Sequence, residues 1–204
     1  MTTANLCRLL AILFLLGSSQ EPRDQPLSKS DAPIYLAVRV SPSRTTIVSG
    51  ETLNLKVDIL NDGARPVYVC KKFDGMGWPL CGVSFELKDS KGSYGPSGTV
   101  GGPDFGPDAN RAVPLSDVLA SDWILLEADH SYGAIIPLNP QTYPQLRKPG
   151  IYRVLCAYSS AGVVEGYFGR VKATPAETAS LMLKSFSGRV EGNPVVVQVR
   201  ARGK

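Results

Sequence analysis

The sequence predicts an all-β protein: an antiparallel β-sandwich of about seven to nine strands, with one short helix in the connection before the last strand. Twenty glycines and sixteen prolines in 204 residues exceed the usual share of about 12%, and both residues are costly inside helices. The apolar content of 43% is too high for a disordered chain. Several short segments alternate between apolar and polar residues, a period of two that is typical of half-buried strands.

The first half of the chain contains four candidate strands. Residues 53–59 form the clearest alternation in the sequence, and the turn at 61–63 ends it, because Asn, Asp and Gly tolerate positive φ. The residues expected to share the core side of this strand are Leu53, Leu55, Val57 and Ile59. The other candidates in this half are residues 34–40, 67–70 and 83–87.

The second half combines a long loop, further strands and the helix. Residues 89–110 are dense in glycine and proline and are predicted to form a long loop. Residues 175–185 are predicted to be helical, with Pro175 near the start, Glu177 in the first turn and Lys184 in the last. The remaining strand candidates are residues 123–127 and 132–138, around a turn at 128–130, then 152–158 and 195–199.

Residues 1–19 have the order of a secretory signal peptide. Arg8 precedes an apolar run at 9–16, and small residues follow at 17–19. The run is shorter than the ~20 residues that cross a bilayer, so we expect cleavage, with an uncleaved anchor as the alternative. The mature protein is expected to be secreted or periplasmic, with no membrane span. We expect residues 20–32 to be a flexible tether and residues 33–202 to be the β-sandwich domain.

The charge pattern argues against nucleic acid as a partner. The formal net charge is +4, and the basic residues are spread along the chain rather than gathered in a run that could follow phosphates. The sequence also lacks a P-loop, an H-E-x-x-H motif and paired C-x-x-C motifs. We therefore expect no nucleic-acid partner, no cofactor and no metal.

Three segments carry a resemblance to a known class of domains. Leu146, Pro149, Gly150 and Tyr152 resemble a tyrosine corner, in which the Tyr hydroxyl bonds back to the upstream backbone. Residues 50–61 resemble an early strand of the same class, and residues 186–195 resemble the approach to its last strand. The chain thus resembles secreted bacterial immunoglobulin-like and fibronectin type III-like β-sandwich proteins of unassigned function. The resemblance implies an immunoglobulin-like architecture and no particular activity.

Three cysteines follow the predicted signal peptide. Cys70 and Cys81 stand at the facing ends of two predicted strands, and a disulfide between them would close a short loop in an oxidising compartment. Pairing of either residue with Cys156 is the alternative. If Cys70 and Cys81 pair, Cys156 is expected to be a buried thiol that packs as a small apolar residue.

The segment between Cys70 and Cys81 is the candidate binding loop. It places Phe73, Met76 and Trp78 in a glycine-containing stretch, and aromatic residues on a pinned loop suit recognition of a protein or glycan surface. The alternative is that Trp78 folds back and covers one end of the sandwich.

Catalytic and metal-binding signals are weak. His130, which is the one histidine, falls in a predicted turn, and no nucleophile motif accompanies it. Five carboxylates of the loop-rich middle lack the spacing of a calcium loop: Asp104, Asp108, Asp117, Asp122 and Asp129.

These observations favour a secreted, monomeric, non-enzymatic binding or structural module with an immunoglobulin-like fold. One alternative is a protease inhibitor that acts through a protruding loop, either 71–80 or 92–110. The other is a hydrolase whose site is built from the loops at 92–126.

Overall fold

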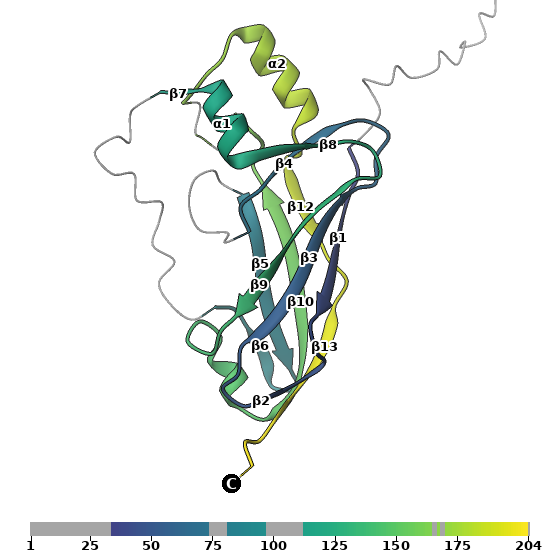
Figure 1. Ribbon diagram of the computed structural model, residues 1–204, viewed down its shortest axis with the longest axis vertical. Helices are drawn as coiled ribbons and strands as arrows, with labels where there is room; N and C mark the ends of the chain where they lie inside the picture. Colours follow the sequence, from purple (N-terminus) through teal and green to yellow (C-terminus); the bar gives the residue numbers. More distant parts are fainter. Residues whose placement is uncertain (1–33, 74–80, 97–111, 165–166, 168–169, 204) are drawn as a thin grey trace, which may run out of the picture.

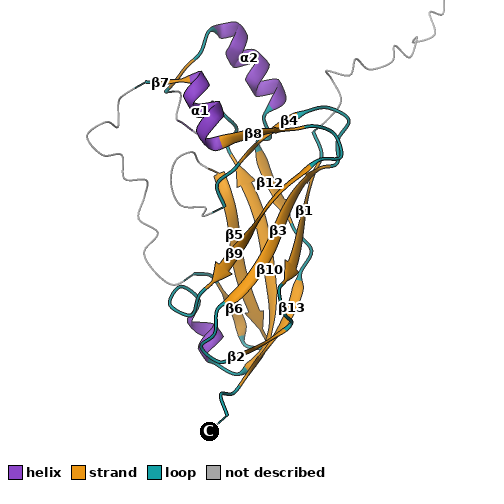
Figure 2. Cartoon of the chain, viewed as in Figure 1, coloured by secondary structure: helices purple, strands orange, loops and turns teal. Residues whose placement is uncertain are grey.

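The computed structural model describes residues 34–73, 81–96, 112–164, 167 and 170–203, and this part of the chain is mostly β (Figure 1). Two larger sheets run along the length of the molecule, and two short helices lie together at one end (Figure 2). Within the described ranges, neither helix is long and apolar enough to cross a membrane.

The first sheet has three antiparallel strands in the order β1 (Leu36–Pro42), β3 (Leu53–Asn61) and β9 (Ser131–Leu138). The alternation predicted for the central strand is present. Its core-side residues Leu53, Leu55, Val57 and Ile59 are completely buried.

The second sheet has the order β2 (Thr46–Val48), β13 (Val195–Arg200), β10 (Gly150–Ser160), β5 (Cys81–Asp89) and β6 (Gly92–Tyr94). A further strand, β12 (Gly188–Glu191), pairs with the second half of β10. The buried sides of both sheets contribute to one hydrophobic core cluster. Its members include Val38, Val57, Phe85, Leu87, Tyr152, Val154 and Val197.

Smaller elements cover the end of the molecule at which the helices lie (Figure 2). The strands β4 (Val67–Cys70) and β8 (Trp123–Leu126) pair with each other, and the two-residue strands β7 (Val113–Pro114) and β11 (Val171–Lys172) form a second short pair. The helices are α1 (Leu115–Asp122) and α2 (Pro175–Lys184). A 3-10 turn, η1 (Pro144–Arg147), lies at the opposite end, close to β2 and β6 (Figure 1).

The expectation of one helix was wrong, because α1 is a second helix. It lies between the predicted loop at 89–110 and the predicted strand at 123–127, in a segment for which no helix or strand was predicted. No side chain caps its first turn, and Val118 is its one buried residue, so the usual signals of a helix start and an apolar face are missing. The helix α2 begins where the sequence predicts it. There, Thr174 and Glu177 form a reciprocal capping box.

The structure differs from the strand prediction in the number and direction of the strands, and it adds the pairing. The described residues contain thirteen strands, more than expected, because four of them have three residues or fewer and show no readable alternation. Two pairings, β2 with β13 and β7 with β11, are parallel rather than antiparallel. The two strands that flank the turn at 128–130 do not form a hairpin, since β8 pairs with β4 and β9 pairs with β3.

Candidate binding surfaces

The residues of the predicted tyrosine corner lie together at the start of β10. The Tyr152 hydroxyl donates a hydrogen bond to the carbonyl oxygen of Lys148 at 3.1 Å. Leu146 is completely buried, and its carbonyl accepts a hydrogen bond from the Gly50 amide at 2.9 Å. The turn through Pro149 and Gly150 is therefore fixed on both sides, by the core and by the β2 edge of the second sheet.

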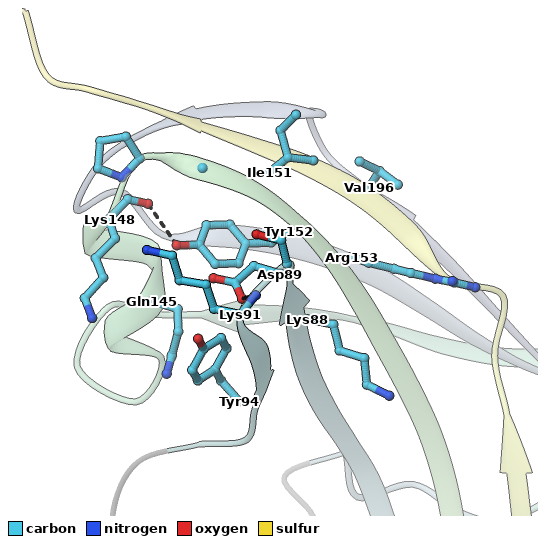
Figure 3. A pocket seen from close by; sticks show the side chains of 13 residues that line it. Lys88, Asp89, Lys91, Tyr94, Gln145, Lys148, Ile151, Tyr152, Arg153 and Val196 are labelled. Carbon is cyan, nitrogen blue, oxygen red and sulfur yellow. Dashed lines mark hydrogen bonds between the residues drawn. The ribbon is translucent and has the colours of Figure 1, made fainter.

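An open groove of about 770 Å³ lies beside this corner (Figure 3). Its walls come from the β5–β6 hairpin, from η1 and the turn that follows it, and from the outer side of β10 and β13. The side chains that line it include Lys88, Asp89, Lys91, Tyr94, Gln145, Lys148, Ile151, Tyr152, Arg153 and Val196.

The groove carries an excess of positive charge. Lys88, Lys91, Lys148 and Arg153 are exposed, whereas Asp89 is the one carboxylate among the lining residues. The Asp89 carboxylate accepts hydrogen bonds from the backbone amides of residues 91 and 92, at 2.7 and 3.0 Å, so it serves the hairpin turn. The groove therefore presents cations to a ligand and is complementary to an anionic one.

Two tyrosines lie in the groove, and both hydroxyls are engaged within the protein, Tyr152 with the Lys148 carbonyl and Tyr94 with the Asp89 carboxylate. Desolvation, followed by the nearby charge of Asp89, raises the pKa of Tyr94 and of Tyr152. Both hydroxyls therefore keep their protons at neutral pH. Gln145 contributes a side-chain oxygen that is buried and has no hydrogen-bond partner among the described residues.

The cysteine bridge lies at the other end of the second sheet. Cys70 is bonded to Cys81, as their spacing predicts, with 6.3 Å between the Cα atoms, and the buried Tyr158 hydroxyl accepts a hydrogen bond from the Cys70 amide at 2.9 Å. Cys156 is a free, buried thiol, and burial raises its pKa to about 12. At neutral pH it is therefore protonated and shielded, which is the state of a packing residue rather than of a nucleophile.

Only part of the candidate binding loop can be placed. Met76 and Trp78 lie outside the described residues. Phe73 is half-buried and packs against Tyr132 of β9, with 5.6 Å between the ring centroids. The described part of the loop thus rests against the sheet.

The start of the same loop is tied to the end of α1. Lys72 forms an ion pair with Asp122 at 3.1 Å, and the Tyr167 hydroxyl donates to the same carboxylate. The Lys71 ammonium donates to the Ala120 carbonyl at 2.6 Å. These contacts explain why Asp122 is held within the structure and is not offered to solvent as a ligand.

The other groups considered for catalysis or metal binding are dispersed. His130 is exposed, and its Nδ1 lies 3.0 Å from the Ala128 carbonyl in its own turn. Asp117 lies in the first turn of α1, and Asp129 occupies the same turn as His130 with a φ of 61°. Asp104 and Asp108 lie outside the described ranges. In the part of the chain that the structure describes, no group of three or more His, Cys, Asp or Glu residues could hold a metal ion.

The sequence interpretation missed the groove, although one signal was available. Ile151 and Val196 occupy strand positions whose neighbours on the same face are polar, and their side chains are 64% and 58% exposed. Apolar residues at outward positions of an alternating strand are a recognisable departure from the pattern. The cations beside them become visible only when the pairing of β5, β10 and β13 is known.

Comparison with known proteins gives neither a family nor an activity. No family model and no curated protein matches this sequence. The chain is similar to the solved CARDB domain of a Pyrococcus furiosus protein, with a TM-score of 0.34 and 10% identity, covering 83% of this chain and 96% of that domain. A β-glucosidase from Erythrobacter marinus has the same TM-score at 11% identity, covering 82% of this chain and 16% of the enzyme. The fold class therefore rests on this chain's own sheets and core.

Proposed function

We propose that this protein is a secreted or periplasmic, non-enzymatic binding module with an immunoglobulin-like β-sandwich fold. Support for the fold comes from the two sheets that share one core cluster and from the hydrogen bond between Tyr152 and Lys148. The disulfide between Cys70 and Cys81 is of the kind that persists in oxidising compartments. Residues 1–19 then serve as the signal peptide, and residues 20–32 serve as a tether.

The groove beside the tyrosine corner is the observation that carries the binding role. Its volume of about 770 Å³ falls within the range of natural ligand sites, roughly 300–1,000 Å³. It combines four cations with tyrosine hydroxyls and exposed apolar side chains. Because it is built on paired strands and a hydrogen-bonded turn, its side chains are held on a rigid support, which lowers the entropy lost on binding.

The inhibitor alternative depends on the loops at 71–80 and 92–110, which fall largely outside the described residues, and the hydrolase alternative depends on 92–126, of which 97–111 fall outside them. Among the described residues, the candidate nucleophile and the candidate base are not placed for catalysis. The Cys156 thiol is buried with a pKa of about 12, and the His130 ring lies against its own turn. The groove therefore favours binding over catalysis.

The test is ligand mapping by NMR on the isotopically labelled protein, with a panel that contains neutral glycans, acidic glycans and short peptides of different charge. We expect at least one class to shift the amide signals of Lys88, Tyr94 and Arg153 while leaving those of β1 and β3 in place. Light scattering on the same sample is expected to give the mass of a monomer. The proposal fails if no panel member shifts the groove signals, or if every binder maps to another surface.

A further inference from the structure

The outer side of the second sheet brings two cations face to face. In the pairing of β5 with β10, Lys88 lies directly opposite Arg153, and both residues are exposed. Like charges at directly opposite positions destabilise a sheet. Glu86 lies 3.7 Å from the Lys88 ammonium. No ion pair reaches Arg153 from the rest of the described chain. An anion placed over this pair would relieve the repulsion.

Exposed apolar surface lies beside the same pair. Val196 is directly opposite Arg153 on the other side, and Ile151 lies two residues before Arg153 on the same face of β10. Ile151 and Val196 are thus diagonal neighbours, near enough for their side chains to form one patch. Figure 3 shows both at the upper edge of the groove, on the side where Arg153 also extends. The apolar side chains of Ile151 and Val196 are therefore exposed to water beside Arg153, which has no ion-pair partner among the described residues.

The remaining groups of the groove reinforce the preference for an anion. Lys91 and Lys148 also line it, and both side chains are exposed. Asp89 is the one lining carboxylate, and its Oδ1 accepts hydrogen bonds from the backbone of its own turn, so one negative charge stands against four cations. The groove lining therefore carries a net positive charge, and the apolar patch of Ile151 and Val196 adjoins it.

We infer, building on the proposed binding role, that the groove takes an acidic peptide segment in extended conformation, with an apolar side chain two positions from a carboxylate. The carboxylate lies over Lys88 and Arg153, and the apolar side chain lies on Ile151 and Val196. The match follows from strand geometry: Ile151 and Arg153 are themselves two residues apart on one face, a separation of about 6.6–6.8 Å. In an extended peptide, residues i and i+2 have the same spacing and direction. A sulfated or uronic-acid polysaccharide would satisfy the cations but would leave the apolar patch uncovered.

The experiment measures the fluorescence anisotropy of short labelled peptides with the disulfide-intact protein. One peptide repeats a Glu-x-Leu pattern, the second has the same composition with Glu and Leu in adjacent positions, and the third replaces Glu by Gln. We expect the first to bind about tenfold more tightly than the third, because each charge-assisted contact contributes on the order of a tenfold change. The second is expected to bind more weakly than the first, and raised salt is expected to weaken the first and leave the third unchanged.

Protein variants test the two halves of the site separately. Arg153→Gln is expected to lower the affinity for the first peptide about fivefold to tenfold and to make that affinity less dependent on salt. Ile151→Ser is expected to lower the affinity for the same peptide and to leave its salt dependence unchanged. Arg39→Gln, at an exposed position of β1 in the other sheet, is the matched control and should bind as the unaltered protein does. Circular dichroism and urea unfolding establish that each variant is folded.

The inference is overturned if the Glu and Gln peptides bind with equal affinity, or if the first peptide does not bind measurably. It is also overturned if Arg39→Gln and Arg153→Gln lower the affinity for the first peptide equally. A heparin fragment that binds more tightly than the peptide and is unaffected by Ile151→Ser would also overturn it and would assign the groove to an anionic polysaccharide. In that case the binding role stands, because the groove still takes a ligand. Both proposals fail together only if neither peptides nor glycans shift the groove signals in the NMR map.

Discussion

Asn193 joins Val40 through both ends of its side-chain amide. The Val40 amide donates to Oδ1 at 2.8 Å, and the Asn193 Nδ2 donates to the Val40 carbonyl at 3.0 Å. Val40 lies on β1, at the edge of the first sheet, and Asn193 lies just before β13 of the second sheet. The amide therefore satisfies the backbone groups that a neighbouring strand would otherwise pair, and it connects the two sheets.

Asn193→Asp tests this connection. The change keeps the shape and the acceptor but replaces the donor by a second oxygen that faces the Val40 carbonyl. We expect the free energy of unfolding to fall by about 1–3 kcal/mol, the cost of leaving a polar group unpaired, as measured by urea denaturation. Asn54→Asp, at an exposed position of β3, is the control. Equal losses in the two variants would show that the Asn193 contact contributes nothing specific.

Tyr152→Phe removes the hydroxyl of the tyrosine corner and keeps the ring. The hydrogen bond to the Lys148 carbonyl is lost, and we expect the free energy of unfolding to fall by about 1 kcal/mol. Tyr35→Phe, whose ring is 58% exposed, should change it by much less. Hydrogen exchange of the amides of Lys148, Gly150 and Ile151 is expected to accelerate in the first variant alone. Unchanged exchange there would mean that the hydroxyl does not fix this turn.

Replacing Cys70 and Cys81 together by Ala tests the contribution of the disulfide. The bond closes a loop with a sequence separation of 11, and its loss is expected to lower the free energy of unfolding by about 3 kcal/mol through the freer unfolded chain. The measurement is urea denaturation of the double variant and of the unaltered protein. A loss below about 1 kcal/mol would contradict the expectation and would indicate a bridge that is strained or seldom formed.

The thiol of Cys156 is expected to resist alkylation. Its side chain is buried, and desolvation raises its pKa from 9.0 to about 12, so almost no thiolate exists at neutral pH. In the protein without residues 1–19, and therefore without Cys7, iodoacetamide should leave the native state unmodified and should add one group after denaturation without reductant, as read by intact mass. Modification of the native protein at the rate of the denatured one would refute the burial.

Alkaline pH is expected to destabilise the protein. Burial raises the pKa of Tyr158 from 10.0 to about 12, an effect partly offset by the hydrogen bond from Cys70, and Cys156 is shifted in the same direction. Because the native state holds these protons more tightly than the unfolded chain, the stabilisation is complete below pH 9 and is lost as the pH rises toward 12. Tyr158 alone contributes about 2–3 kcal/mol to this decline.

Urea denaturation at several pH values measures the decline, and the absorbance of tyrosinate reports the ionisation itself. Tyr158→Phe should flatten the dependence on pH, although it lowers stability at neutral pH by leaving the Cys70 amide unpaired. A free energy of unfolding that stays constant up to pH 11 would be incompatible with two buried groups that titrate near pH 12.

The parts of the fold that local pattern controls could be predicted from the sequence. The alternation at Leu53–Ile59 predicts a strand, and the start of α2 is marked by Pro175 and Glu177. The helix α1 could not be predicted, since it lacks a capping side chain and buries Val118 alone. Its stability comes from packing against β7 and β8 rather than from its own composition.

The groove escaped prediction for a different reason. Lys88, Arg153 and Val196 lie on three strands that are far apart in the sequence. Only the register of β5, β10 and β13 places these residues in one row. Period-two patterning says which side of a strand a residue faces, but not which residue lies beside it. Cys70 and Cys81 could be paired in advance because so few residues separate them.

The position of β13 has a mechanical consequence. It lies between β2 and β10, and it ends at the end of the molecule opposite the start of β1 (Figure 1). Tension between the two ends of the domain would therefore run along the strands and load many transverse hydrogen bonds at once. This is a shear geometry, in which the bonds cannot open one after another as in a zipper. A ligand that binds at Ile151 and Arg153 would lie on β10, which pairs directly with β13 in this sheet.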